Sequence, residues 1–249
     1  MKHLIYITFI STLLLSCGST KTVTPAKYDP KFSFTPEERS QISENSLSVA
    51  IIDPVFSDGE DNNLVQPYAG FVRNMADDIE ETLNAKGFKI KGPYKNRDEM
   101  VYGDKLNSDF ALEIEVEILA EKGDFGAKST DFGTQLICKT CVKYAGTFYH
   151  EGRIILTATD PLDGEKFWKK TIDLDRKAVV TNGYLNFDSS KGNPTDEQLL
   201  SDVGIYNPIA KVLESYYQQS MNNIARQMDP RELAEISKQI KAKRKRIGQ

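Results

Sequence analysis

The sequence predicts a single α+β domain: a mixed or antiparallel sheet of four to six strands, two amphipathic helices packed on one face, and a basic C-terminal helix. Residues 68–86 and 208–228 each carry apolar side chains at three- and four-residue steps, which is typical of a helix with one buried face. Residues 112–118 alternate between apolar and polar side chains, as a half-buried strand does. Because each helix needs a sheet to cover, both helices are expected on the same sheet face.

The first 16 residues are expected to be a cleaved secretory signal. Lys2 and His3 precede an apolar stretch, residues 4–15, which is shorter than the ~20 residues that a membrane span needs. The ending Leu-Leu-Ser-Cys resembles the lipobox of bacterial lipoproteins, and this resemblance implies that Cys17 becomes the acylated N-terminus. Gly18 follows instead of an aspartate, which in such lipoproteins implies release to the outer membrane. An ordinary signal peptide with an incidental cysteine is the alternative.

The mature chain is expected to have three parts. Residues 17–44 form the acylated N-terminus and a tether, residues 45–228 form the α+β domain, and residues 229–249 form a basic helical tail. Within the tether, the sequence Thr-Pro-Glu-Glu at residues 35–38 is typical of a capping box and predicts a short helix. The mature chain has a formal charge of −5, because removal of residues 1–16 takes away one of 32 basic and none of 36 acidic side chains.

The first strand is predicted at residues 47–56, where a nearly continuous apolar run favours a central position in the sheet. The polar loop at residues 58–63 has oxygen ligands for a cation but lacks the spacing of an EF-hand, so a solvated turn is favoured and no metal or other cofactor is predicted. The helix at 68–86 runs into a short strand at 88–91, which ends at Gly92-Pro93.

Three glutamates alternate with the apolar residues of the strand at 112–118: Glu113, Glu115 and Glu117. Paired carboxylates can perform acid–base chemistry, but catalytic pairs converge from different elements across a cleft. Three glutamates on one strand at a period of two favour the solvent-facing side of a sheet.

Cys138 and Cys141 are the remaining cysteines, and in an exported protein a disulfide between them is favoured. The bond requires a turn between them, because residues i and i+3 of a strand lie about 10 Å apart while a disulfide needs Cα atoms within ~7 Å. A free thiol pair, a redox centre and a metal site are the alternatives. A zinc site would need about four ligands, and His150 is the only histidine of the mature chain.

Residues 152–174 are predicted to form a hairpin around the turn Asp-Pro-Leu-Asp-Gly-Glu at 160–165. Residues 181–202 then have the composition of a long polar connection, and such loops are often functional. This connection, with the loop near residues 122–128, is the best candidate for a recognition surface, while its composition fits a mobile surface loop as well. The candidate ligand-binding residues are Lys122, Lys128, Tyr184 and Phe187.

The last core helix is expected to begin at a cap formed by Asn207 and Pro208. From Asp229 onward the chain carries seven basic and three acidic residues, a net +4 against −9 for the rest of the mature chain. This tail could contact an anionic membrane, lipopolysaccharide or glycan, while a solvated helix is the alternative. The acidic body and the export signal argue against a nucleic-acid partner.

Four features occur in a characteristic order: the strand Val-Ala-Ile-Ile-Asp-Pro at 49–54, the helix end Leu-Asn-Ala-Lys-Gly-Phe-Lys-Ile at 83–90, the turn at 160–165, and the closing basic helix. With them, the chain from residue 47 to residue 246 resembles the neuraminyllactose-binding haemagglutinin family of bacterial outer-membrane lipoproteins. The resemblance implies adhesion and sialylated-glycan binding. The proposed sugar-binding stretch of that family is rich in Lys and Arg, whereas residues 121–128 carry equal numbers of bases and acids, so that sugar site is not transferred to this chain.

Two classes of function therefore remain. The first is an adhesin-like, non-catalytic binding lipoprotein of the outer membrane. The second is a periplasm-facing scaffold or assembly lipoprotein that docks on an envelope protein complex. An enzyme is not expected, because no Gly-x-Ser-x-Gly, phosphate loop or zinc spacing supplies catalytic residues.

Overall fold

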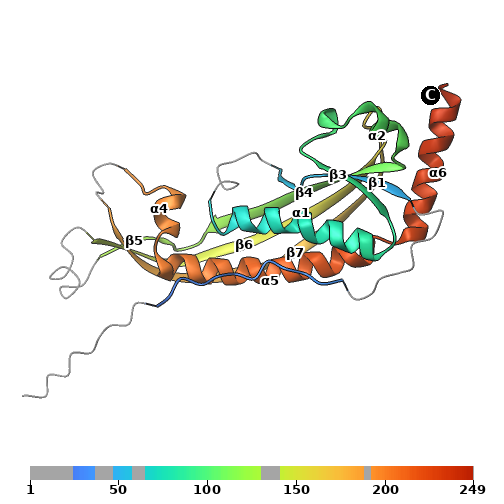
Figure 1. Ribbon diagram of the computed structural model, residues 1–249. Helices are drawn as coiled ribbons and strands as arrows, with labels where there is room; N and C mark the ends of the chain where they lie inside the picture. The colour runs from blue at the N-terminus through green and yellow to red at the C-terminus, as the bar shows by residue number, and fades with distance from the viewer. Residues whose placement is uncertain (1–24, 37–46, 58–64, 130–140, 188–191, 249) are drawn as a thin grey trace, which may run out of the picture.

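The computed structural model describes residues 25–36, 47–57, 65–129, 141–187 and 192–248. It confirms the α+β class: a mixed sheet carries long helices along one face (Figure 1). The sheet formed by the described residues has seven strands, more than predicted, because the short strands β2 and β5 pair beside the long ones. The strands are β1 (Ser48–Ile52), β2 (Val55–Phe56), β3 (Lys89–Tyr94), β4 (Phe110–Lys122), β5 (Gly126–Lys128), β6 (Cys141–Thr159) and β7 (Lys166–Asn186). The α-helices are α1 (Tyr68–Ala85), α2 (Tyr102–Asn107), α4 (Asp196–Leu200), α5 (Val203–Gln227) and α6 (Pro230–Arg246).

The sheet joins a parallel part to a long antiparallel hairpin. β1 lies between β3 and β4 and is parallel to both, so Val49 pairs with Ile90 on one side and with Phe110 on the other. β4 is antiparallel to β6, and β6 is antiparallel to β7. The apolar run of β1 is buried over four of its five residues, as expected of a central strand.

The two predicted helices pack on the same sheet face. Phe71 and Ile79 of α1, and Leu213 and Ile224 of α5, are fully buried in one core with the inward side chains of β1, β4, β6 and β7. Figure 1 shows α1 and α5 lying lengthwise along the strands. The apolar stripes read from the sequence are therefore the surfaces that hold the helices to the sheet.

The face opposite α1 and α5 is named here the open face. Glu113, Glu115 and Glu117 project from it and are only partly buried, which confirms that they form the solvent-facing side of β4. Glu117 forms an ion pair with Arg153 on the neighbouring strand β6. These carboxylates therefore belong to the sheet surface and do not converge on a second element across a cleft.

The hairpin of β6 and β7 is longer than predicted. Its turn lies at residues 160–165, as expected, but β7 continues to Asn186, so the predicted polar connection at 181–202 is wrong in its first part. Thr181, Gly183 and Leu185 are buried while the residues between them are exposed, which is the two-residue period of a strand. The sequence did not reveal this period, because most of the residues involved are small or polar. Further along, residues 196–200 form α4, which begins at a capping box on Thr195.

The N-terminal segment of residues 25–36 is bound to the body of the protein, although the sequence predicted a tether there. Phe32 is buried between Phe71 and Tyr217, with ring centroids 5.7 Å and 5.4 Å away. The Tyr28 hydroxyl donates to the Glu214 carboxylate at 2.5 Å. Figure 1 shows this blue segment running along α5. Its aromatic residues follow no helix or strand period, so periodicity could not reveal that they are buried.

The start of α5 was also predicted wrongly. The helix begins at Val203, where the Asp202 side chain accepts a hydrogen bond from the Gly204 amide, and it continues past Pro208. Asn207, expected to be the cap, instead accepts from the Tyr28 amide and donates to the Ala26 carbonyl. None of the helices in the described part of the chain is both long and apolar enough to span a bilayer.

Candidate functional site

A cavity of about 370 Å³ lies on the helix-covered face of the sheet. Figure 1 shows two of the elements that contribute to its lining, α4 and the start of α1. Its floor is formed by β4 and β6, and its walls come from the first residue of α1, from α4 and from the beginning of α5. Most of its lining is apolar: Phe56, Val116, Ile118, Leu119, Ala120, Phe148, Leu199, Leu200, Ile205 and Ile209. A cavity of this size and composition falls within the range of small-molecule sites, roughly 300–1,000 Å³.

Two polar side chains meet in the buried lining of the cavity. The Tyr68 hydroxyl and His150 Nε2 are 3.0 Å apart and form a hydrogen bond in which the tautomer of the imidazole decides the donor. Burial lowers the pKa of His150 to about 4 and raises that of Tyr68 well above its usual value. Both groups are therefore uncharged at neutral pH.

The second ring nitrogen of His150, Nδ1, is buried and has no hydrogen-bond partner among the described residues. A buried polar atom left unpaired typically costs about 1–3 kcal/mol, so such an atom needs an explanation. A ligand that supplies one hydrogen-bonding group would remove this cost.

A bulge in the hairpin supports the backbone at His150. The pairing of β6 with β7 shifts between His150 and Gly152, where β7 contains one extra residue. The Tyr216 hydroxyl lies 2.6 Å from the carbonyl oxygens of both His150 and Asp175 at this bulge. Gly152 is required here, because a Cβ atom at this position would collide with the carbonyl oxygen of Glu117. Fixed in this way, the imidazole faces the same side of the sheet as the helices.

The polar pair in the cavity is a hydrogen-bonded phenol and imidazole. Within the described residues, the imidazole of His150 bonds to a phenol and not to a serine, threonine or cysteine, so the nucleophile–base pair of acyl transfer is not formed. The described residues also contain no group of three His, Cys, Asp or Glu side chains placed to hold a metal ion.

The structure separates the four predicted ligand-binding residues. Lys122 is at the end of β4 and lines the cavity. Lys128 of β5 pairs with Lys143 of β6, which pairs with Tyr184 of β7, so these three residues form one row on the open face. Phe187 follows β7 and, with Tyr184, lines a smaller hollow of about 260 Å³ beside the end of α4. The predicted residues thus lie near one end of the sheet, on two different faces.

The row of Lys128, Lys143 and Tyr184 is named here the cationic row. The Lys143 ammonium lies 5.9 Å from the centroid of the Tyr184 ring, within the range of a cation–π interaction. The ammonium of Lys128 also donates to the Asp124 carbonyl at 2.8 Å. Lys143 carried no specific signal in the sequence, because only the register of three strands places it between the other two residues.

Several predicted features lie outside the described residues. They are Cys17, the short helix expected after residue 35, the polar loop at 58–63 and Cys138. Cys141 is described, as the first residue of β6. Because Cys138 is not, the disulfide between the two stays a prediction.

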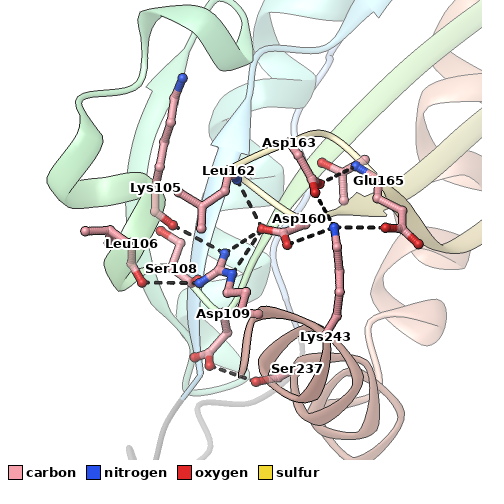
Figure 2. A network of polar contacts seen from close by, with 12 residues as sticks. Lys105, Leu106, Ser108, Asp109, Asp160, Leu162, Asp163, Glu165, Ser237 and Lys243 are labelled. Atoms are coloured by element: carbon pink, nitrogen blue, oxygen red, sulfur yellow. Dashed lines mark hydrogen bonds and ion pairs between the residues drawn. The ribbon is translucent and has the colours of Figure 1, made fainter. Parts of the chain in front are cut away.

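The basic C-terminal helix packs against the body of the protein. Arg244 donates from Nε and Nη2 to one oxygen of the fully buried Asp160, at 3.1 Å and 2.7 Å. Lys243 pairs with Asp160, Asp163 and Glu165 of the hairpin turn, as Figure 2 shows. These carboxylates raise the pKa of Lys243 despite the opposing effect of burial. Part of the positive charge expected to face an anionic surface is therefore neutralised within the molecule.

A second contact fixes α6 near its middle. The Asp109 carboxylate, just before β4, accepts from the Ser237 hydroxyl at 2.7 Å and pairs with Lys241 at 2.5 Å (Figure 2 shows the serine contact). Together with the turn at 160–165, this contact holds α6 at the end of the sheet away from the cavity (Figure 1).

No family model and no curated protein matches the sequence. Among solved structures, the fold is similar to that of a homolog of the neuraminyllactose-binding hemagglutinin from Helicobacter pylori. That similarity has a TM-score of 0.58 and 14% identity over 85% of this chain and 97% of that chain. It confirms, at the level of the fold, the resemblance drawn from the sequence.

Two further solved structures align over most of their length. A lipoprotein from Neisseria meningitidis has a TM-score of 0.30 and 12% identity, over 71% of this chain and 99% of that chain. A protein from Xanthomonas campestris has a TM-score of 0.38 and 13% identity, over 88% of this chain and 99% of that chain. TM-scores this low do not establish a shared fold.

Proposed function

We propose that the chain is an outer-membrane lipoprotein, acylated at Cys17, whose body is a non-catalytic, adhesin-like module that binds an acidic glycan. The observation that carries the glycan part is the cationic row. Two ammonium groups beside an exposed aromatic ring suit a carboxylated sugar, because each ammonium can pair with the carboxylate and the ring can pack against the carbon face of the sugar. Sialylated glycans have this chemistry.

The similarity to the Helicobacter pylori structure supports the proposal at the level of the fold. The neutral Tyr68–His150 pair supports the non-catalytic part, because it lacks the partners of an acid–base or nucleophilic centre. Contact of the basic tail with an anionic surface would fall mainly to Lys245 and Arg246, since Lys241, Lys243 and Arg244 pair within the protein.

A second candidate is a periplasm-facing scaffold that docks on an envelope protein complex. Val180 projects from the open face and is 71% exposed, and Leu119, which also lines the cavity, is 53% exposed. Large apolar side chains at solvent-facing strand positions favour a protein partner over a sugar. The two candidates differ in their ligand and in the side of the membrane on which they act.

A glycan array tests the first candidate, using the mature chain with Cys17→Ser so that it remains in solution. Residues 25–36 must be kept, because Phe32 belongs to the core. Binding to sialylated glycans, lost in Lys143→Ala and Tyr184→Ala but retained in Lys169→Ala, would support the glycan proposal. Lys169 is a matched control because it is an exposed lysine of β7 far from the cationic row.

A pull-down from envelope extracts tests the second candidate with the same protein. Recovery of one envelope protein by the parent, but not by Val180→Lys, would favour the scaffold. An array without glycan hits would then reject the glycan part of the proposal.

A further inference from the structure

The cavity between α4 and β4 has the composition of a site for an aliphatic ligand. Its interior is built from branched and aromatic side chains, among them Ile118, Phe148, Leu199 and Ile209. Three charged residues also line it: Glu117 is half-buried, while Lys122 and Asp196 are exposed, which places them at the mouth. A ligand that enters therefore passes from a charged rim into apolar surroundings, where each buried methylene adds to the binding.

We propose that this cavity binds a fatty acyl chain, with the carboxyl or ester group of the ligand near Tyr68 and His150. A sugar is a poor fit for the same space, because most of its hydroxyl groups would be buried without partners. The buried part of the lining instead offers one uncharged hydrogen-bonding pair among apolar side chains. An acyl chain has one polar group at its end and nothing polar along its length.

The unpaired Nδ1 of His150 gives this pair a role in binding. A neutral imidazole has one N–H donor and one acceptor, and Tyr68 uses only Nε2. The oxygen of an acid or ester can accept from such a donor, and the hydroxyl of an undissociated acid can donate to such an acceptor. Either tautomer therefore leaves one ring position without a partner, and an acyl group can use it once the side chains that bury Nδ1 move aside, whereas a pure hydrocarbon cannot.

The N-terminal segment places the cavity close to the source of such a ligand. The Ala26 carbonyl accepts from Asn207 at 3.0 Å, and Asn207 lies on α5 between Ile205 and Ile209, both of which line the cavity. Cys17 precedes Pro25 by eight residues, which span at most about 28 Å when extended. This step rests on the proposed acylation of Cys17, which would bring the cavity within reach of membrane lipids.

The test uses the mature chain with Cys17→Ser, stripped of bound lipid by a hydrophobic resin. Two probes distinguish the sources of the acyl chain: hexadecanoic acid, which displaces a fluorescent fatty acid, and vesicles of phosphatidylglycerol that carry a fluorescent phospholipid. Saturable binding of one chain per protein to either probe is expected. Fatty acid alone identifies the free acid as ligand, and phospholipid transfer identifies a membrane lipid.

Two variants connect that binding to the cavity. Ala120 is an exposed cavity residue that pairs with His150 across β4 and β6, so Ala120→Trp should fill the space and weaken binding at least tenfold. Ala178→Trp makes the same change at an exposed position on the open face, and it should leave binding unchanged. Thermal unfolding of both variants checks that they fold.

A photoactivatable fatty acid gives a second measurement on the unaltered chain. Its crosslinks should map to peptides that contain Ala120, Leu199 or Ile209. Absence of binding to both probes, equal binding by Ala120→Trp, or crosslinks confined to the open face would overturn the proposal. A negative glycan array would not affect these results, so the two proposals can fail separately.

Discussion

His150 determines which chemical groups the cavity can accept. Its side chain is fully buried, and burial lowers its pKa to about 4, whereas an imidazole in an unfolded chain has a pKa near 6.5. The side chain is thus neutral over the whole pH range in which free histidine becomes charged. In the buried part of the cavity a ligand therefore meets an uncharged hydrogen-bonding group, while the charge of Lys122 lies in the exposed part of the lining.

This burial predicts a pH-dependent stability. Between pH 6.5 and 4 the unfolded chain binds a proton at His150 and the folded protein does not, so the free energy of unfolding falls as the pH decreases through this window. From pH 7 to pH 5 the loss from His150 should be about 2 kcal/mol. Urea unfolding at pH 7, 6 and 5 measures it.

His150→Gln is the comparison for that experiment, because it removes the titrating group and keeps a polar side chain. His150 is the only histidine of the sequence after His3, so in a protein that lacks the first 16 residues the difference between the two pH profiles reports this residue alone. Parallel profiles for parent and variant would show that the imidazole is not held neutral by burial.

Among the elements, α6 depends most on charge. Asp160 is fully buried and Arg244 nearly so, and the guanidinium also reaches the carbonyls of Leu106 and Ser108 at 3.3 Å and 3.4 Å. Removing Arg244 would leave the buried Asp160 carboxylate with Lys243 alone, at 3.4 Å, and breaking a buried pair typically costs 3–5 kcal/mol. The ion pair therefore fixes where α6 lies.

Arg244→Ala should accordingly lower the free energy of unfolding by about 3–5 kcal/mol and detach the end of α6. Lys238→Ala, on the same helix, removes an exposed pair with Glu235 and should cost under about 0.5 kcal/mol. Urea unfolding gives the energies, and hydrogen exchange of α6 amides gives the local effect. Similar values for the two variants would contradict a buried, directional pair.

The segment of residues 25–36 belongs to the folded body. Phe32→Ala should lower the free energy of unfolding by about 3 kcal/mol, because it removes a buried ring that contacts Phe71 and Tyr217. Lys31→Ala alters an exposed side chain next to it and is expected to have an effect within about 0.5 kcal/mol. Equal stability of both variants and the parent would mean that the segment does not contribute to the core.

The sequence was informative where a side-chain period was clear. α1, the apolar side of β4 and the turn at 160–165 were predicted correctly, because each carries a strong local pattern. The segment at 25–36 and the extension of β7 were missed. The first has no regular secondary structure, and the second alternates between small, polar and aromatic residues that resemble a loop.

The candidate sites depended more on tertiary structure. In the sequence, Tyr68 was read as part of the apolar stripe of a helix. His150 was considered only as one histidine, too few for a zinc site. The two residues are 82 positions apart in the chain. The one signal in the sequence that could have indicated this site was a lone histidine, His150, at an inward position of a strand. Nothing in either local pattern predicts that they meet, because their contact depends on how α1 packs against β6.

At the scale of the whole molecule, the cavity lies at one end of the sheet and the basic helix α6 at the other. The N-terminal segment meets α5 beside the cavity, and α6 packs at the opposite end of the sheet (Figure 1). Under the proposed anchoring, the cavity and the cationic row lie at the end nearer the membrane, and the hairpin turn with α6 points away from it. A partner in the same membrane would therefore meet the cavity end first.

The anchor itself provides the most direct test of this account. Cells producing the parent chain or Cys17→Ser are separated into soluble and membrane fractions, and the intact mass of the mature protein is measured. The account predicts that the parent is recovered from the outer membrane with the added mass of acyl chains on Cys17, and that the variant is recovered without acyl mass and outside the membrane pellet. Recovery of the variant in the membrane pellet, processed in the same way as the parent, would contradict it.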